Sequence, residues 1–455
     1  MRALHFAHGA TAGSCGFGTS KKCSRSTSSC FSRPNRAIPQ PEVRTDHPFE
    51  GWFGTLTRRI VEEMSRFFAC AASTAALFGT LAFVAPLRAS AQNASPSPGP
   101  SPTASPTPAS VPNVTWQTNV GYYTFETNGV NAVGALDSPT GVDQGGRADW
   151  SNIMVGVTRN TGVFRFGGTI GEYAFPVIGM ALNPTFQQGA NTSLYSFVPS
   201  AYVQVVPSSA WTFTLGKMAT LLGQENGFTW QNVDVQRGLG WSMEPTFSRG
   251  VRATYASGKF TGDLEYDDGF YSGNHRALEG LAGWAPSANT NVQFAFILPE
   301  VNTPPNPTAS VANKREYDLM VTQQFGKLQL TPYFLSVRSP GYASLGYRGD
   351  ETAYAGALIA NYVFSPAWSF GMRYETVGNN SVSSDPSGNA DLVGYGAGSR
   401  AQTITLTPEF KTGALSVRAE YSFVQLGSFL PGLGFGRTGN GNTQNRLGAE
   451  LGVQF

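Results

Sequence analysis

The sequence has little charge and, over most of its length, no cysteine. Charged residues make up 13% of the 455 residues, about half of the roughly 25% that soluble domains carry. The four cysteines all lie before residue 71, so the rest of the chain has no disulfide framework and no thiolate metal site. The second half also has no run of about 20 apolar residues, which excludes a membrane-spanning helix there.

Glycine and aromatic side chains are abundant instead. The chain has 53 glycines, and aromatic residues make up 12% of it. This composition, without long apolar runs, is typical of a β-rich membrane protein. Residues 1–91 hold 11 of the 31 Lys and Arg and 5 of the 29 Asp and Glu, which leaves 20 against 24, a net charge of −4. No basic patch therefore indicates a nucleic-acid partner.

Residues 64–91 have the three parts of a secretory signal peptide. Arg66 gives the basic start, an apolar stretch follows, and "ASA" is the closing small-residue site. Sec-dependent export with cleavage between Ala91 and Gln92 is therefore predicted. A transmembrane anchor is the alternative, but Ser, Thr and Pro residues interrupt the apolar stretch.

The segments on either side are expected to have no core of their own. Residues 1–63 lack hydrophobic periodicity and precede a signal peptide, where a polar stretch of that size is unusual. We therefore expect Met64 to be the natural start and 1–63 to be a non-native, disordered extension. Residues 92–113 are rich in Pro, Ser and Thr, which predicts an extended linker before a β-domain over 114–455.

From residue 114 onward the sequence alternates with the two-residue period of β-strands. In "WTFTLG", Trp211, Phe213 and Leu215 share one face and threonines occupy the other. In "WSFGMRYE", aromatic residues and Met alternate with Arg373 and Glu375. A soluble β-sandwich alternates in the same way, so alternation alone does not identify the class of protein.

The lengths of the connections separate these two classes. Short connections, such as 160–162 and 411–413, alternate with long polar ones, such as 219–247 and 376–401. Tight turns at one rim and long loops at the other are typical of outer-membrane β-barrels. Seven short and eight long connections predict an all-β, antiparallel transmembrane barrel of about 16 strands, with about 14–18 as the range allowed by boundary errors.

Alternation also divides the side chains between lipid and lumen. The lipid face must be apolar, because polar groups without partners are costly in hydrocarbon. The other face is predicted to line a water-filled lumen, where facing rows of Arg and acidic side chains would tune ion selectivity. Pairing of these charges across neighbouring strands is the alternative. The pore-lining candidates are Arg165, Arg252, Asp263, Glu265, Arg373, Glu375, Arg418, Glu420, Arg446 and Glu450.

The chain ends on the alternating segment "NRLGAELGVQF". Leu451, Val453 and Phe455 fall on its apolar face. The aromatic final residue resembles the signal that the β-barrel assembly machinery reads by strand addition, and an ordinary last strand is the alternative. This machinery and outer-membrane lipid are the predicted partners, and the bacterial outer membrane is the predicted location.

The longest connection, 219–247, is the candidate constriction loop. It follows the fifth predicted strand and carries Glu225, Asp234, Arg237 and Glu244. Porins of 16 strands commonly fold one long loop into the lumen. The sequence therefore allows two locations for this segment, inside the barrel or over its mouth.

Candidate catalytic and metal sites are few. After residue 91 the one histidine is His275, with Ser272 nearby, which is too little to predict a Ser–His hydrolase. An acidic cluster at 263–268 could bind calcium, but a solvated lumen wall is the favoured interpretation. We therefore predict no enzyme activity, no cofactor and no metal.

Three short motifs lie between residues 215 and 255. Gly216 and Lys217 close one strand, Gly223 and Glu225 form a Gly-x-Glu in the loop, and "GVR" at 250–252 opens the next strand. In these motifs the chain resembles the putative β-barrel porin-2, OmpL-like, family. The resemblance implies an outer-membrane barrel that acts as a channel.

The function predicted from the sequence is passive diffusion of small hydrophilic solutes or ions through an outer-membrane porin. Inward-facing Gly, Ser and Thr residues favour an open lumen, and barrels of 16–18 strands usually enclose an aqueous channel. A homotrimer is the candidate assembly. A non-conducting barrel that serves as a structural tether or adhesin is the alternative function.

Overall fold

The computed structural model describes residues 114–129, 145–182, 185, 196–269, 277–299, 314–339, 351–380 and 392–455. The expected extension at 1–63, the signal peptide at 64–91 and the linker at 92–113 lie outside the described residues. Among the described residues, no helix is long and apolar enough to cross a membrane.

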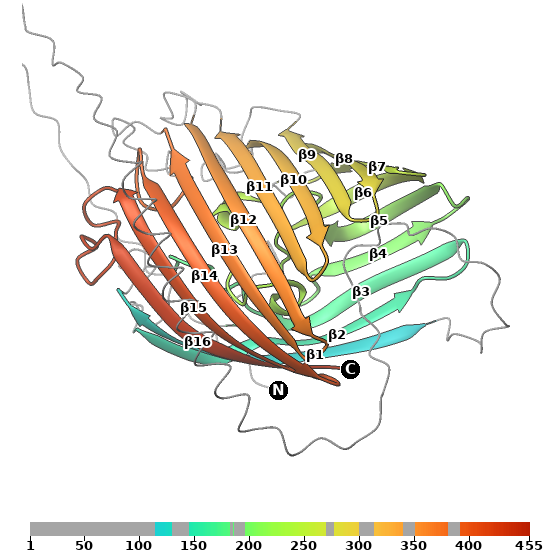
Figure 1. Cartoon of the computed structure of the whole chain (residues 1–455). Helices are drawn as coiled ribbons and strands as arrows, with labels where there is room; N and C mark the ends of the chain where they lie inside the picture. Colours follow the sequence, from blue (N-terminus) through green and yellow to red (C-terminus); the bar gives the residue numbers. More distant parts are fainter. Residues whose placement is uncertain are drawn as a thin grey trace, which may run out of the picture. The chain divides into compact units, whose positions relative to one another are not determined.

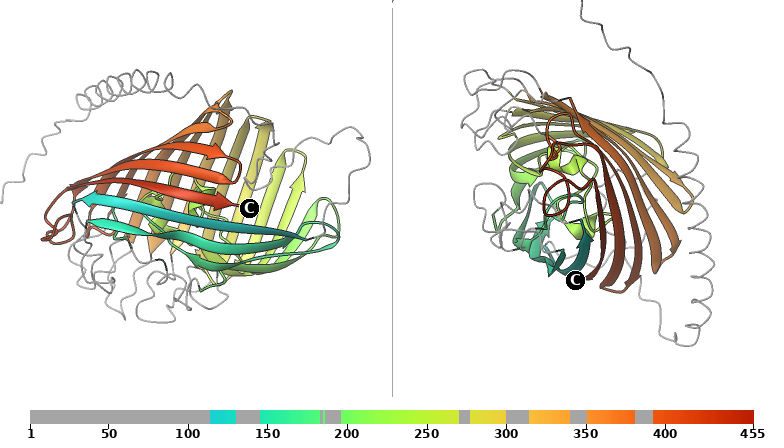
Figure 2. Two further views of the ribbon diagram at one scale, coloured as in Figure 1. Left: turned by 90° about the horizontal axis from the view of Figure 1, so that it is seen from below. Right: turned by 90° about the vertical axis from the view of Figure 1, so that its left-hand side faces the viewer.

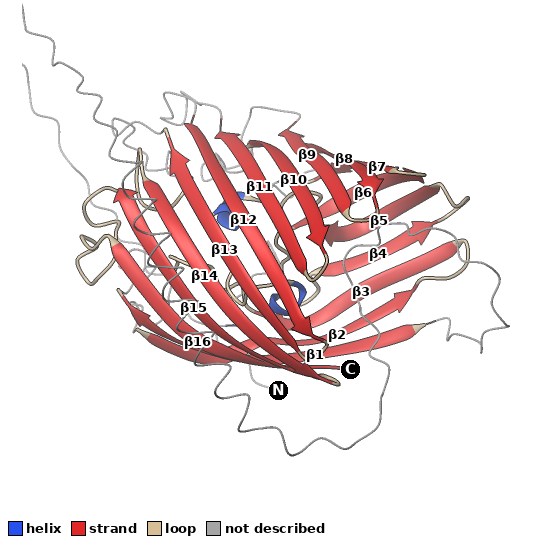
Figure 3. Ribbon diagram, in the orientation of Figure 1, coloured by secondary structure: helices blue, strands red, loops and turns tan. Residues whose placement is uncertain are grey.

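The described residues form a closed β-barrel of sixteen strands (Figures 1 and 3). Each strand pairs antiparallel with the next one along the chain, and β1 pairs with β16 to close the sheet. The predicted fold class and strand number are thus confirmed. The strands are β1 (Thr115–Asn128), β2 (Gly146–Arg159), β3 (Phe164–Tyr173), β4 (Ser200–Val205), β5 (Trp211–Ala219), β6 (Phe247–Ser257), β7 (Phe260–Asp267), β8 (Ala277–Ser287), β9 (Thr290–Pro299), β10 (Arg315–Phe325), β11 (Leu328–Ser339), β12 (Glu351–Ser365), β13 (Trp368–Asn379), β14 (Arg400–Thr412), β15 (Leu415–Ser428) and β16 (Thr443–Gln454).

Glycines set the tight turns at one rim. Gly258, Gly326 and Gly413 each begin a two-residue connection between strands and have φ of 59°, 58° and 57°. Two-residue hairpins of the II′ type need a positive φ at this first position, which glycine adopts at little cost. These turns leave all the long connections at the opposite rim, as the spacing of the sequence predicted.

The outer face of the barrel is an apolar band. Phe164, Leu264 and Leu447 are 69%, 52% and 63% exposed, whereas inward neighbours such as Glu265 and Arg446 are buried. A hydrocarbon environment can solvate the first set but not the second. These strands therefore have the predicted alternation of an apolar outer face and a polar inner face.

The barrel interior contains chain as well as side chains. The segment that joins β5 to β6, residues 220–246, lies within the barrel in both views of Figure 2 and includes the short 3-10 helices η2 (Thr229–Gln231) and η3 (Gly240–Met243). We call residues 220–246 the lumen segment. Its apolar side chains Leu222, Leu239 and Met243 are buried in one cluster with inward side chains of β9, β11 and β12. The lumen segment therefore packs on the wall rather than over the mouth.

Candidate functional site

Two asparagines shape the first half of the lumen segment. The side chain of Asn232 donates to the carbonyls of Asn226 and Phe228 at 2.8 and 2.9 Å, and the Asn226 N–H donates to the Asn232 side-chain oxygen at 2.7 Å. These bonds close the turn around η2 without help from a regular element. The lumen segment therefore has its own local structure before it meets the wall.

One side of the barrel holds the lumen segment with three arginines and three glutamates. We call the inward side chains of β13, β15 and β16 the arginine wall, which consists of Arg373, Glu375, Arg418, Glu420, Arg446 and Glu450. All six side chains are buried. A buried charge is tolerated when it is paired and hydrogen-bonded, and the partners of these six come largely from the lumen segment.

The arginines reach into the lumen segment. Arg373 forms an ion pair with Glu225 and lies 3.4 Å from a carboxylate oxygen of Asp234, and it also donates to the Gln236 carbonyl at 2.9 Å. Arg418 pairs with Glu450 and donates to the Thr229 carbonyl at 3.0 Å. These guanidinium groups thus bind both side chains and main chain of the segment.

Arg446 extends the arginine wall to a second loop. It donates to the carbonyls of Val177 and Met180, which follow β3, and to the side-chain oxygen of Gln236 at 3.0 Å. Val177 and Arg237 also form an isolated parallel β-bridge. Arg446 therefore joins the wall, the lumen segment and residues 174–182 in one polar network.

The glutamates of the arginine wall accept backbone N–H groups. Glu375 accepts from Leu239 and Gly240, both at 2.7 Å, where η3 begins. Glu420 accepts from the N–H groups of Val235 and Gln236 at 2.5 and 3.2 Å. A carboxylate that accepts two N–H groups satisfies donors that would otherwise be costly to bury. The main chain of the segment is fixed at both places.

A different side of the barrel presents carboxylates without a matching set of arginines. We call the inward side chains of β7, β8 and β10 the acidic wall, which consists of Glu265, Asp267, Glu279, Glu316 and Asp318. Glu265 lies opposite Glu279, and both Glu279 and Glu316 lie opposite Ile297 of β9. The three glutamates therefore follow one row across four strands.

The acidic wall also contacts the lumen segment. Glu279 accepts from the Leu221 N–H at 3.1 Å, and Asp318 accepts from the Gly223 N–H at 2.8 Å. Arg252 of β6 pairs with Glu265 at 2.5 Å. Among ion pairs between described residues, this is the one that includes a member of the acidic wall.

Arg237 is buried inside the lumen segment. Its guanidinium lies 5.6 Å from the ring centre of Phe175 and 5.5 Å from that of Trp241, and it donates to the carbonyls of Asn226 and Gly227. Burial lowers the pKa of Arg237 to about 9, with the negative charge of Glu225 acting in the opposite direction. The aromatic rings and carbonyls take the place of water around this cation.

The two glutamates of the lumen segment have raised pKa values. Burial raises the pKa of Glu225 to about 7, although Arg373 beside it and the N–H of Gly238 act to lower it. Burial, with the nearby charge of Asp318, also raises the pKa of Glu244 well above its ordinary value, and the hydroxyl of Tyr333 donates to this carboxylate. The pKa of Glu225 therefore lies near neutral pH.

The structure brings most of the sequence-predicted residues together around the lumen segment. The inner face of the barrel carries Arg252, Glu265 and the six residues of the arginine wall. The lumen segment itself contributes Glu225, Asp234, Arg237 and Glu244. Two candidates lie elsewhere: Arg165 donates to the Gly162 carbonyl at the tight turn, and Asp263 accepts from Thr254. Their predicted contribution to a pore lining stays a prediction.

Sequence reasoning missed Glu279, Glu316 and Asp318. The signal was present in "REYDLM", where Glu316 and Asp318 alternate with Tyr317 and Leu319. The acidic cluster at 263–268 is divided in the structure. Asp268 pairs with Arg249 at 2.6 Å, while Asp267 belongs to the acidic wall and lies near Glu265 and Glu279. His275 and Ser272 lie outside the described residues.

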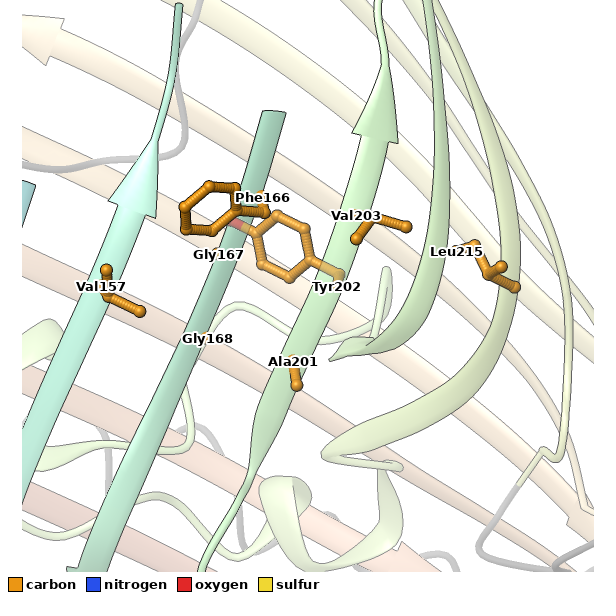
Figure 4. Close-up of a pocket in the computed structure, with 8 residues that line it drawn as sticks. All are labelled: Val157, Phe166, Gly167, Gly168, Ala201, Tyr202, Val203 and Leu215. Carbon is orange, nitrogen blue, oxygen red and sulfur yellow. The ribbon is translucent and has the colours of Figure 1, made fainter. Parts of the chain in front are cut away.

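A shallow apolar hollow lies on the outer wall over β2 to β5 (Figure 4). Gly168 and Ala201 form its floor, and Phe166, Val203 and Leu215 stand around them. These larger side chains belong to the exposed apolar band. The hollow therefore faces lipid and is not a site for hydrophilic solutes.

A closed barrel of sixteen antiparallel strands, with an apolar outer band and a charged lumen that holds an internal loop, defines the class of outer-membrane porins. Within that class, the chain belongs to the family described as Putative beta-barrel porin-2, OmpL-like, whose model matches residues 119–455. The chain is thus a porin, a passive diffusion channel of the bacterial outer membrane. No curated protein matches it.

Several solved structures are similar to this chain. The outer membrane channel DcaP of Acinetobacter baumannii is 11% identical, with 75% of this chain and 97% of that chain covered and a TM-score of 0.49. The anion-selective porin from Comamonas acidovorans is 13% identical, with 75% and 99% covered and a TM-score of 0.49. The trimer form of OmpT from Vibrio cholerae is 12% identical, with 75% and 99% covered and a TM-score of 0.47.

Proposed function

We propose that this porin passes small hydrophilic solutes and ions through the part of the lumen that the lumen segment leaves free. The observation that carries the proposal is the clamping of this segment by both walls. Leu221 and Gly223 bind the acidic wall, while Val235, Gln236, Leu239 and Gly240 bind the arginine wall. A loop fixed in this way narrows the lumen by a constant amount.

We further propose that the two walls tune the selectivity of the channel. Arginines balance the glutamates on β13 to β16, whereas carboxylates outnumber the one paired arginine, Arg252, on β7 to β10. Charges of opposite sign on different sides of a narrow polar passage sort permeating ions and orient dipolar solutes. The ten pore-lining candidates and the four residues of the lumen segment are proposed to act in this way.

The test is single-channel conductance of the purified protein in a planar bilayer. Discrete current steps that scale with salt concentration are expected. The sign of the reversal potential in a salt gradient then tells whether carboxylates or arginines dominate. A folded barrel with no conductance under any salt would contradict the proposal and favour the structural tether or adhesin instead. Swelling of liposomes in sugars of increasing size gives an independent size limit.

The proposed route to the membrane begins with Sec export and cleavage between Ala91 and Gln92. N-terminal sequencing of the protein purified from outer membranes tests this position, and a mature chain that starts elsewhere would contradict it. Phe455, Val453 and Leu451 are proposed to be read by the assembly machinery. In the folded barrel Phe455 already pairs with Thr118 of β1 through two backbone hydrogen bonds of 3.1 and 2.9 Å. Deletion of Phe455 should therefore lower outer-membrane yield.

A homotrimer without catalytic activity completes the proposal. The exposed apolar band needs lipid or a second protomer as its neighbour. Cross-linking in native membranes distinguishes these cases, since a band of three protomers is expected for the trimer. Lipid hydrolysis assays on the same membranes are expected to show no dependence on the protein, because channel conduction needs no covalent step.

A further inference from the structure

Three carboxylates converge where the lumen segment returns to the barrel wall. Glu244 lies just after η3, and Glu316 and Asp318 are on β10. One oxygen from each of these side chains lies within 4.8 Å of the other two. All three residues are buried, with exposed fractions of 6%, 0% and 1%. Three like charges this close and this dry repel one another strongly unless a cation or protons intervene.

Three of the six carboxylate oxygens in this group have no donor. Both carboxylate oxygens of Glu316 and Oδ1 of Asp318 accept no hydrogen bond from an N–H or hydroxyl group. Glu316 and Asp318 lie close enough to share a proton in a hydrogen bond with each other. Tyr333 donates to Glu244, and the Gly223 N–H donates to the other oxygen of Asp318. Buried acceptors are almost always satisfied in folded proteins, so a fully buried side chain with two open oxygens points to a ligand.

Among the described residues, this group has more negative than positive charge. Lys314 is buried two residues before Glu316, and its positive charge acts on Glu316. With all three carboxylates ionised, the group and Lys314 carry a net charge of −2, and the carboxylate of Glu279 acts on Asp318 in addition. A divalent cation removes two of these charges in one step, and protons are the alternative. The open oxygens of Glu316 and Asp318 are hard ligands of the kind that alkaline-earth cations prefer.

We propose that Glu244, Glu316 and Asp318 form a Ca²⁺ site that joins the lumen segment to β10. Calcium binds oxygen at about 2.3–2.6 Å, so its ligands can stand up to about 5 Å apart, whereas Mg²⁺ needs distances near 2.1 Å and a tighter shell. The upper limit of 4.8 Å on the separations in this group is compatible with the larger ion. The proposal concerns binding and does not depend on conduction through the barrel.

The second carboxylate group of the acidic wall provides an internal comparison. Glu265, Asp267 and Glu279 also lie within 4.8 Å of one another. There, however, Arg252 pairs with Glu265, and Glu279 accepts from Thr220, Leu221 and Ser248. With Arg252 counted, this group also carries a net charge of −2, and Glu265 Oε1 and Asp267 Oδ2 have no partner. No side chain in it has both carboxylate oxygens open, however, whereas Glu316 has, so we assign the calcium site to the group with Glu316.

The test is calcium binding by the full chain folded in detergent. Terbium, which binds oxygen ligands as calcium does, should luminesce when nearby tyrosines are excited, because Tyr333 touches Glu244. Calcium is expected to displace the bound terbium at lower concentration than Mg²⁺ does. Glu316→Gln should weaken calcium binding by about 10- to 100-fold or more, while Glu265→Gln should leave it within about twofold, since a residue outside the site affects the affinity little.

Folding is checked for each variant by the shift in electrophoretic mobility between heated and unheated samples. Asp318→Asn is the second variant, because an asparagine oxygen still accepts the Gly223 N–H while one ligand charge is lost. The proposal is overturned if the folded wild-type chain binds no calcium, which would favour shared protons. It is also overturned if Glu316→Gln and Asp318→Asn bind as wild type, or if Glu265→Gln alone abolishes binding.

Discussion

The arginine wall and the acidic wall hold the same lumen segment, but with opposite charge balance. On the arginine wall, three guanidinium groups face three carboxylates, and Arg373 and Arg418 each have a carboxylate partner among the described residues. On the acidic wall, five carboxylates share the single guanidinium of Arg252. Both walls use carboxylates to accept N–H groups of the segment. The two walls therefore anchor the segment in the same way and differ in how their negative charge is balanced.

The comparison shows that hydrogen bonding and charge compensation are separate requirements. Glu420 and Asp318 both accept backbone N–H groups, but only Glu420 also lies near an arginine of its own wall, Arg373. A buried anion needs both kinds of partner to be stable. The arginine wall therefore supplies its own opposite charges, whereas the proposed cation would supply the missing positive charge on the acidic wall.

The largest expected effect comes from breaking the arginine wall at Arg373. Arg373→Met keeps most of the side-chain volume but leaves Glu225 and Asp234 buried without their cation, which should cost about 3–5 kcal/mol of unfolding free energy. The lumen segment should also become accessible to protease. Urea unfolding in detergent and proteolysis with mass spectrometry measure the two effects.

Arg165→Met is the matched control for this prediction. Arg165 donates to the Gly162 carbonyl and forms no ion pair with any described residue. Its loss should cost less than about 1 kcal/mol. Equal effects of the two substitutions would mean that the buried network around Arg373 has no special role.

A smaller effect is expected at Glu420, where an amide would face two N–H donors. Glu420→Gln should weaken the hold on Val235 and Gln236 by about 1.5–3 kcal/mol. Amide hydrogen exchange at these two residues should accelerate by about 10- to 100-fold. Glu409→Gln is the control on β14, because Glu409 pairs with Lys411 at 3.0 Å and accepts from Ser369; unchanged exchange at Val235 in both variants would refute the anchoring role.

Neutralising one glutamate on each wall should have effects of opposite sign. Glu450→Gln leaves Arg418 without its partner and should lower the unfolding free energy by about 1–3 kcal/mol. Glu316→Gln removes a negative charge from the acidic wall. With divalent ions chelated, this substitution should raise the unfolding free energy by about 1–2 kcal/mol. Parallel urea unfolding curves in chelator measure both, and a loss of stability in both variants would remove the distinction between the walls.

The smallest effect is a pH dependence from Glu225 in the lumen segment. Its pKa is raised from 4.5 to about 7 by burial, so its contribution to stability is full below pH 4.5 and is lost as the pH rises through about 7. In conduction, a fall of pH through 7 removes one negative charge from the lumen. The reversal potential in a salt gradient should then move toward anion selectivity, and this step should be absent in Glu225→Gln.

The sequence determined the barrel to the level of its strands. Alternation in "KFTGDLEYDD" placed Leu264 and Tyr266 on the lipid face and Glu265 inward, and the glycines of the short turns marked one rim. These features are local, because they depend on the side-chain period of a strand and on the φ values that a two-residue turn allows. The same local pattern put Leu447, Leu451 and Phe455 on the outer face of β16.

Only the tertiary structure decided where the lumen segment lies and which charges meet there. Glu225 finds Arg373 from 148 positions away, and Thr229 finds Glu450 from 221 positions away. Strand alternation says that a side chain points inward, but the curvature and closure of the barrel decide which inward side chains approach one another. For that reason the sequence identified Arg373 and Glu244 as candidates, while the meeting of Glu244 with Glu316 and Asp318 came from the fold.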